Sequence, residues 1–151
     1  MGNDSVLLCY CRKTAKEWVR IGGRGSSSGV SDSGKPYGSE FKTLYQSGNI
    51  KFIQSNSGSA KTPMETMTKG RVYATVNSSG QVKAITYYDK HNKRYKQIDV
   101  IGSKHMVNGQ KIIPHTHKGY EHDEKGTKAP SAKQQKMIDR ILTTWQNKDS
   151  K

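Results

Sequence analysis

The sequence predicts an α+β fold, in which a small antiparallel β-sheet is packed against a C-terminal amphipathic helix. Two observations lead to this prediction. Short runs of alternating apolar and polar residues, separated by turn residues, fill the middle of the chain, and a helical spacing of apolar residues closes it. A chain of 151 residues has the length of one domain. We expect that domain to cover residues 39–148 and residues 1–38 to be an N-terminal segment with a Gly/Ser-rich linker.

The middle of the chain contains five runs that are typical of strands. The first two flank Ser47-Gly48-Asn49, which is a turn sequence that favours a hairpin. The last three are separated by turn-rich segments at intervals of about ten residues, which favours an antiparallel meander. Because apolar and polar residues alternate along these runs, we expect one face of the sheet to be buried and the other to face solvent. The five runs are residues 41–45, 50–53, 71–76, 82–88 and 94–101.

The last element is a helix that begins after Pro130. Ser131 is followed three residues later by Gln134, which is the pattern of a capping box at a helix N-terminus. Apolar residues then recur with helical spacing, so one face of the helix is expected to pack on the sheet. These apolar residues are Met137, Ile138, Ile141, Leu142 and Trp145.

The net charge of +14 is the first indication of function. Such an excess of Lys and Arg concentrates polyanions near the surface, and nucleic acid is the commonest partner, although a basic surface can also serve solubility alone. No run approaches the roughly 18 apolar residues of a membrane span, so no membrane partner is expected. Cys9 and Cys11 are one residue apart, too close for an easy disulfide, which favours a reducing compartment.

All five histidines fall between His91 and His122. Cleavage of RNA without a metal requires a base for the 2′-hydroxyl proton, an acid for the leaving 5′-oxygen, and cations near the phosphate. Histidine suits the first two roles because its pKa lies near neutral pH. In an extended segment His115 and His117 point to the same side. We therefore predict that His105, His115 and His117 are catalytic, with Asp99 orienting one of them, and we expect no cofactor.

Four further residues are candidates for binding the substrate. Arg71, Lys96 and Lys104 can each contact phosphate. Tyr87 and Tyr88 are adjacent, so one ring is expected in the core and the other, with Tyr87 as the candidate, is expected to be exposed and to stack on a base.

Other interpretations of the same residues remain open. The His115-x-His117 pair, together with His105, His122 or Asp123, can hold Zn²⁺, as in a metal-dependent nuclease. The histidines can also be merely structural or exposed. In that case the chain is a non-catalytic nucleic-acid-binding part of a phage head or packaging apparatus.

Several segments resemble the toxin modules of the barnase–EndoU–colicin–RelE-like ribonuclease group. The resemblance is to those modules found at the C-terminus of phage head-morphogenesis proteins and of bacterial polymorphic toxins. It covers roughly residues 20–147 and is strongest over residues 62–122. The segments that carry it are Gly70-Arg71-Val72-Tyr73, the run from Tyr87 to Asp99 with Gln97-Ile98-Asp99, Lys104-His105, and the run from Pro114 to Tyr120 with Pro114-His115-Thr116-His117.

This resemblance implies a compact sheet with a helix or two packed on it and a metal-independent ribonuclease site on the exposed sheet face. It also implies a toxin that cleaves RNA, with tRNA among the candidate substrates, in the cytoplasm of a target or host cell. A cognate immunity protein and a larger phage or secreted carrier protein are the implied partners. The Gly/Ser-rich segment from Gly22 to Gly38 is then the joint to the carrier.

Overall fold

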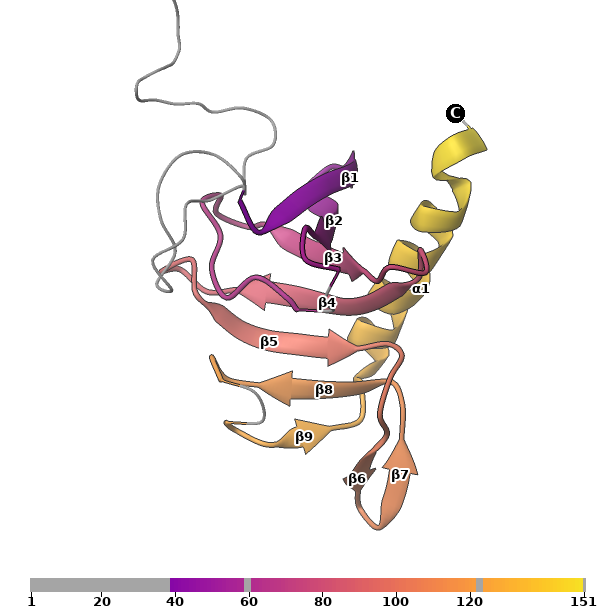
Figure 1. Ribbon diagram of the computed structural model, residues 1–151. Coiled ribbons are helices and arrows are strands. Elements are labelled where there is room, and N and C mark those ends of the chain that lie inside the picture. The colour runs from indigo at the N-terminus through magenta and orange to yellow at the C-terminus, as the bar shows by residue number, and fades with distance from the viewer. Residues whose placement is uncertain (1–38, 59–60, 122–123, 151) are drawn as a thin grey trace, which may run out of the picture.

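A large sheet with one helix across one of its faces forms the fold, which confirms the predicted α+β class (Figure 1). The computed structural model describes residues 39–58, 61–121 and 124–150, so the expected N-terminal segment and linker lie outside the described residues. Within these ranges the sheet has seven strands in the order β1-β2-β3-β4-β5-β8-β9. Those strands are β1 (Phe41–Ser47), β2 (Ile50–Ser55), β3 (Val72–Val76), β4 (Val82–Tyr88), β5 (Arg94–Asp99), β8 (His115–Lys118) and β9 (Thr127–Lys128).

Most neighbouring strands are antiparallel, as predicted, and one pair differs. Strands β1 and β2 form the expected hairpin, in which Gly48 takes a φ of 60°, a conformation that glycine adopts without a steric penalty. Strands β3, β4 and β5 form the expected meander. Strands β2 and β3, which residues 56–71 connect, are parallel, and Val72 at the start of β3 lies opposite Ile50 at the start of β2. A connection of that length permits a parallel pair, whereas a tight turn does not.

A second, two-stranded sheet was not predicted. It consists of β6 (His105–Val107) and β7 (Gln110–Ile112), which form a hairpin beyond the β8–β9 edge of the large sheet (Figure 1). The turn residues Asn108 and Gly109 both have positive φ, 50° and 81°. Asn-Gly is the strongest short sequence signal for such a hairpin, so this element was predictable.

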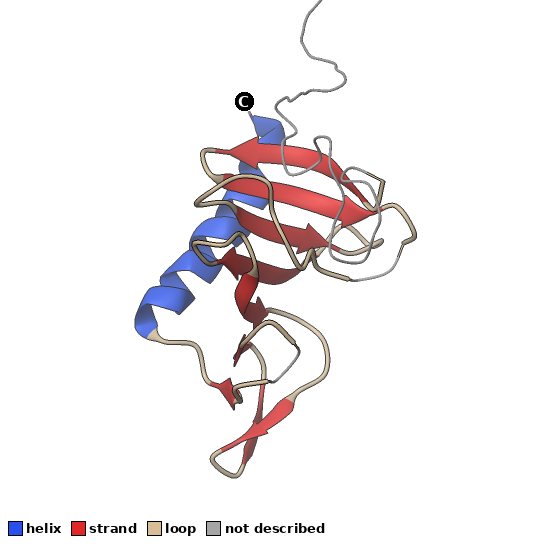
Figure 2. Ribbon diagram, turned by 90° about the vertical axis from the view of Figure 1, so that its left-hand side faces the viewer, coloured by secondary structure: helices blue, strands red, loops and turns tan. Residues whose placement is uncertain are grey.

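The helix α1 (Ala132–Asn147) begins as predicted and is followed by a short 3₁₀ turn, Lys148–Ser150. The Ser131 side chain accepts a hydrogen bond from the Gln134 backbone amide, and the Gln134 side chain accepts one from the Ser131 amide, which completes the capping box. Figure 2 shows the helix crossing one face of the sheet. None of the helices in the described part of the chain is both long enough and apolar enough to pass through a lipid bilayer.

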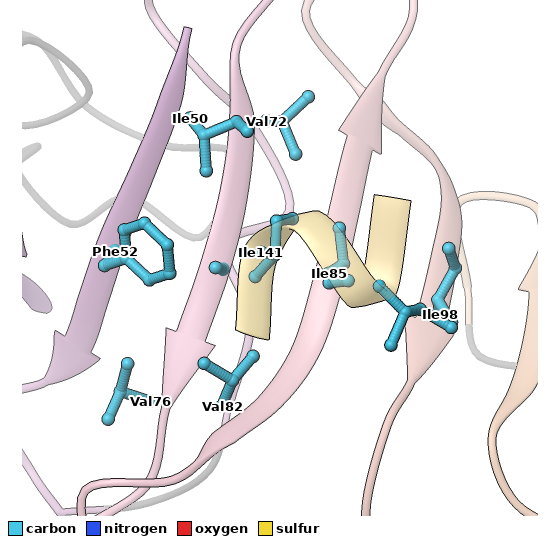
Figure 3. Packing of buried hydrophobic residues seen from close by; sticks show 10 residues of the cluster. Ile50, Phe52, Val72, Val76, Val82, Ile85, Ile98 and Ile141 are labelled. Carbon is cyan, nitrogen blue, oxygen red and sulfur yellow. The ribbon is translucent and has the colours of Figure 1, made fainter. Parts of the chain in front are cut away.

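The hydrophobic core lies between α1 and the sheet. Ile138 and Ile141 of the helix are buried, and Ile141 lies over Ile85 of β4 (Figure 3). At the other end of the contact, the indole of Trp145 stacks on Phe52 with ring centroids 5.1 Å apart. All five predicted apolar residues of the helix therefore belong to the core or pack against it.

Candidate functional site

The two faces of the sheet have different chemistry. Strand residues that point toward α1 are apolar, as with Phe52, Ile85 and Ile98. Because side chains alternate along a strand, their neighbours point to the opposite face. Five polar or charged side chains on that face are less than 9% exposed, namely those of Lys51, Thr75, Thr86, His115 and His117.

Three histidines meet at the end of this polar face. His115 and His117 lie on the same side of β8, as expected, with ring centroids 4.7 Å apart. His105 of β6 stacks on His115 at 4.4 Å and meets His117 edge to face at 4.9 Å. One ring nitrogen of each histidine lies within 4.8 Å of those of the other two. Residues ten and twelve positions apart in the sequence therefore form one cluster, which we call the histidine cluster.

Asp99 joins the histidine cluster from the adjacent strand. In the antiparallel register of β5 and β8, Asp99 is opposite His115, and its Oδ2 lies 3.4 Å from His115 Nε2 and 3.3 Å from His117 Nε2. Its other oxygen, Oδ1, accepts a hydrogen bond of 2.6 Å from the side-chain amide of Gln97. Gln97 is itself held by Arg94, whose guanidinium donates to the Gln97 side-chain oxygen at 3.0 Å. These contacts fix the orientation of the carboxylate.

The backbone determines which nitrogen of His115 carries its proton. His115 Nδ1 lies 3.2 Å from the carbonyl oxygen of Ile112, and a carbonyl oxygen can only accept. Nδ1 is therefore protonated, and Nε2 of the neutral ring has a lone pair. That Nε2 is buried, has no hydrogen-bond partner and lies beside the Asp99 carboxylate. A cation between these two atoms, either a proton or a metal ion, relieves the repulsion between their electron pairs.

Access to the cluster differs among its members. His115 and His117 are only 0% and 3% exposed, while His105 is partly exposed. The resemblance implied a site on an exposed sheet face, and the structure instead covers two of the three histidines. A ligand from solvent therefore reaches His105 before it reaches the other two.

The structure places Lys96 and Tyr87 on the other face of the sheet. The Lys96 ammonium lies 4.3 Å from the centre of the Tyr87 ring, which packs against the hydrophobic core. Burial lowers the pKa of Lys96, and the charges of Lys118 and Lys133 lower it further. These three lysines form a basic patch, contributed by β5, β8 and α1, on the opposite side of the sheet from the histidine cluster.

Other predicted residues are found away from the cluster. Arg71 is 6% exposed and donates a 3.4 Å hydrogen bond to the carbonyl of Asn49, so it is not available as a surface phosphate contact. Lys104 is exposed and directly precedes β6. His91 lies in the exposed turn between β4 and β5, and His122 and Asp123 lie outside the described residues.

The prediction of one exposed ring at Tyr87 and Tyr88 is wrong. Both rings are partly buried, because a bulge between the two residues disturbs the alternation and the loop before β3 covers Tyr88. The Tyr88 hydroxyl donates a 2.6 Å hydrogen bond to the carbonyl of Pro63. The tyrosine with the most accessible ring in this region is Tyr95, which is 43% exposed.

Two residues that contact the histidines or Asp99 were not among the predicted site residues. Gln97 precedes Asp99 by two positions on the same strand, so period-two alternation alone would have placed both side chains on the same face. Thr127 of β9 lies 2.9 Å, through its Oγ1, from Nδ1 of His117. No sequence signal identified Thr127, because β9 has only two residues.

The chain was compared with protein-family models, curated proteins and solved structures, and no match was found in any of them.

Proposed function

We propose that this protein is an endoribonuclease whose active centre is the histidine cluster with Asp99. The observation that carries the proposal is the convergence of three imidazoles and one carboxylate, from β5, β6 and β8, in a chain with a net charge of +14. Histidines near a carboxylate provide the base and acid that phosphodiester transesterification requires. Attack by the RNA 2′-hydroxyl then leaves a 2′,3′-cyclic phosphate.

The different burial of the histidines suggests different roles. His105 is the most accessible, so it is the residue that we assign to proton transfer with the RNA, with His117 as its partner. His115 and Asp99 are assigned as positioning residues, because Ile112 and Gln97 fix their orientation. The histidine nitrogens need not be at their catalytic spacing before RNA binds, since such contacts tighten in the substrate complex.

The basic patch supports RNA as the substrate. Lys96, Lys118 and Lys133 lie on the α1 side of the sheet, and only the short edge of β8 and β9 separates them from the histidine cluster. A depression of about 590 Å³ next to Lys118 is lined by four basic and two acidic residues, together with Tyr95 and Tyr120. An RNA strand that passes around this edge contacts the patch and the cluster at once.

The basic patch leads to a prediction about salt dependence. Lys96→Gln and Lys118→Gln are each expected to reduce the slope of log affinity against log salt by about 0.7, because each removes one contact with a single-stranded phosphate. The probe is a fluorescent single-stranded DNA, which lacks the 2′-hydroxyl and is not cleaved. Lys42→Gln on β1, at the opposite edge of the sheet, is the control and should leave the slope unchanged. Equal slopes in all three variants would show that the patch is not the binding surface.

The decisive experiment is incubation of the purified protein with total cellular RNA and with plasmid DNA, each with and without EDTA. We expect discrete RNA fragments that persist in EDTA and end in 2′,3′-cyclic phosphate, and intact DNA. The variant with alanine at His105, His115 and His117, purified in the same way, controls for contaminating ribonuclease. Full activity in this variant rules out the proposed centre. Intact RNA in every lane with salt-sensitive binding would favour the non-catalytic nucleic-acid-binding alternative.

The same proposal includes the biological setting that the sequence resemblance implies. An endoribonuclease of this kind acts in the cytoplasm of a target or host cell, as part of a phage-encoded or polymorphic toxin. A cognate immunity protein then protects the producing cell. Co-expression with neighbouring open reading frames and rescue of growth would identify that protein.

A further inference from the structure

The three nitrogens of the histidine cluster lie close enough together to hold a metal ion, and Asp99 lies beside two of them. In a tetrahedral zinc site with bonds of about 2.0–2.1 Å, neighbouring ligand atoms are about 3.4 Å apart. Asp99 Oδ2 lies 3.4 and 3.3 Å from Nε2 of His115 and His117, respectively. The histidine nitrogens lie within 4.8 Å of one another, so the widest pair needs to close by at most about 1.4 Å to reach that spacing.

The surroundings of the ligand atoms also favour a metal ion. Nδ1 of His115 donates to a backbone carbonyl, which leaves Nε2, the buried atom without a hydrogen bond, as the coordinating nitrogen. Metal-binding histidines typically use their second nitrogen in this way, and the partner fixes the ring. In His117, Nδ1 lies 2.9 Å from Thr127 Oγ1, a hydroxyl that can accept its proton, and Nε2 lies beside Asp99. Three imidazoles with one carboxylate suit zinc-type ions, whereas Mg²⁺ and Ca²⁺ prefer oxygen ligands.

We propose that His105, His115, His117 and Asp99 bind one zinc-type divalent cation in a closed, four-ligand site, and that the bound ion inhibits the ribonuclease. Four protein ligands leave no open position for water, which is typical of structural sites and not of catalytic ones. The metal also occupies the nitrogen lone pairs that proton transfer needs. The inhibition rests on the proposed function, whereas the metal site does not.

Binding is tested first, without RNA. The EDTA-treated and then chelator-free protein is titrated with Zn²⁺ in a calorimeter and with Co²⁺ in a spectrophotometer. We expect one ion per chain, the visible absorption of tetrahedral Co²⁺, and a higher unfolding temperature with Zn²⁺. Asp99→Asn, which preserves the side-chain shape, and His105→Ala should each weaken binding at least tenfold. His91→Ala is the matched control and should bind like the unmodified protein.

Each result of the titration either supports or overturns the site. Absence of binding, or octahedral Co²⁺ spectra, overturns it. Equal binding by Asp99→Asn, His105→Ala and the unmodified protein overturns it as well, because the ion then lies elsewhere. Asp99→Asn keeps the test valid if His105→Ala fails to fold.

RNA cleavage is then measured in EDTA, with one equivalent of Zn²⁺, and with Zn²⁺ followed by excess EDTA. We expect RNA cleavage in EDTA, loss of cleavage with one equivalent of Zn²⁺, and recovery of cleavage after excess EDTA is added. Activity that requires Zn²⁺ would overturn the closed-site proposal and favour a metal-dependent nuclease. Absence of cleavage under every condition, with normal Zn²⁺ binding, would refute the proposed ribonuclease and support the metal site as a structural one.

Discussion

Replacing His105 with alanine is expected to slow RNA cleavage by roughly 10²–10⁴-fold, the usual contribution of one general acid or base. His105 is the member of the cluster that a ligand in solvent reaches first, because His115 and His117 are buried beneath it. The measurement is the single-turnover cleavage rate of a fluorescent RNA in EDTA, with the protein in excess.

His91→Ala is the control for this variant, because it makes the same substitution at an exposed turn outside the cluster. Its cleavage rate should equal that of the unmodified protein. Circular dichroism and thermal unfolding of both variants test whether the fold is intact. A well-folded His105→Ala protein with an unchanged rate would refute the proposed role of His105 in cleavage.

The largest effect on stability is expected for Ile141→Ala, which should lower the free energy of unfolding by about 2–5 kcal/mol. Ile141 is 0% exposed and lies at the centre of the contact between α1 and the sheet (Figure 3). Alanine removes buried methyl and methylene groups and leaves a cavity that the close-packed surroundings fill only in part. Urea unfolding at equilibrium measures the change, and the slope with denaturant should stay constant.

Arg140→Ala is the neighbouring control, since Arg140 is exposed on the same helix. Its effect is expected to stay within about 0.5 kcal/mol, the range for surface substitutions. If both variants lose the same stability, the helix contributes through its helical propensity and not through packing on the sheet.

The elements that the sequence predicted are those whose signals are local. The capping box of Ser131 and Gln134 determines where α1 begins, and the apolar spacing from Met137 to Trp145 determines the face that it buries. The β1–β2 hairpin was predictable because Gly48 adopts a positive φ within the turn. The parallel pairing of β2 with β3 was not, because it joins strands that a long connection separates and does not depend on any local pattern.

The site was predictable in its residue types and only partly in its geometry. Alternation correctly placed His115 and His117 on one side of β8, and register then brought Asp99 opposite His115. Lys96 and Asp99 are three positions apart on β5, so alternation places them on opposite faces, although the prediction assigned both to one site. The burial of the histidine rings was also unpredictable, because it results from elements that are distant in the sequence.

The histidine cluster is divided between two sheets, and this division has an energetic consequence. His105 belongs to the β6–β7 hairpin, whereas the other three groups belong to the large sheet. A hairpin of two three-residue strands, with Met106 61% exposed, has little buried apolar surface of its own. Separating His105 from its partners therefore costs only a local opening free energy, well below that of global unfolding. One member of the histidine cluster can therefore separate from the other groups while the large sheet stays folded.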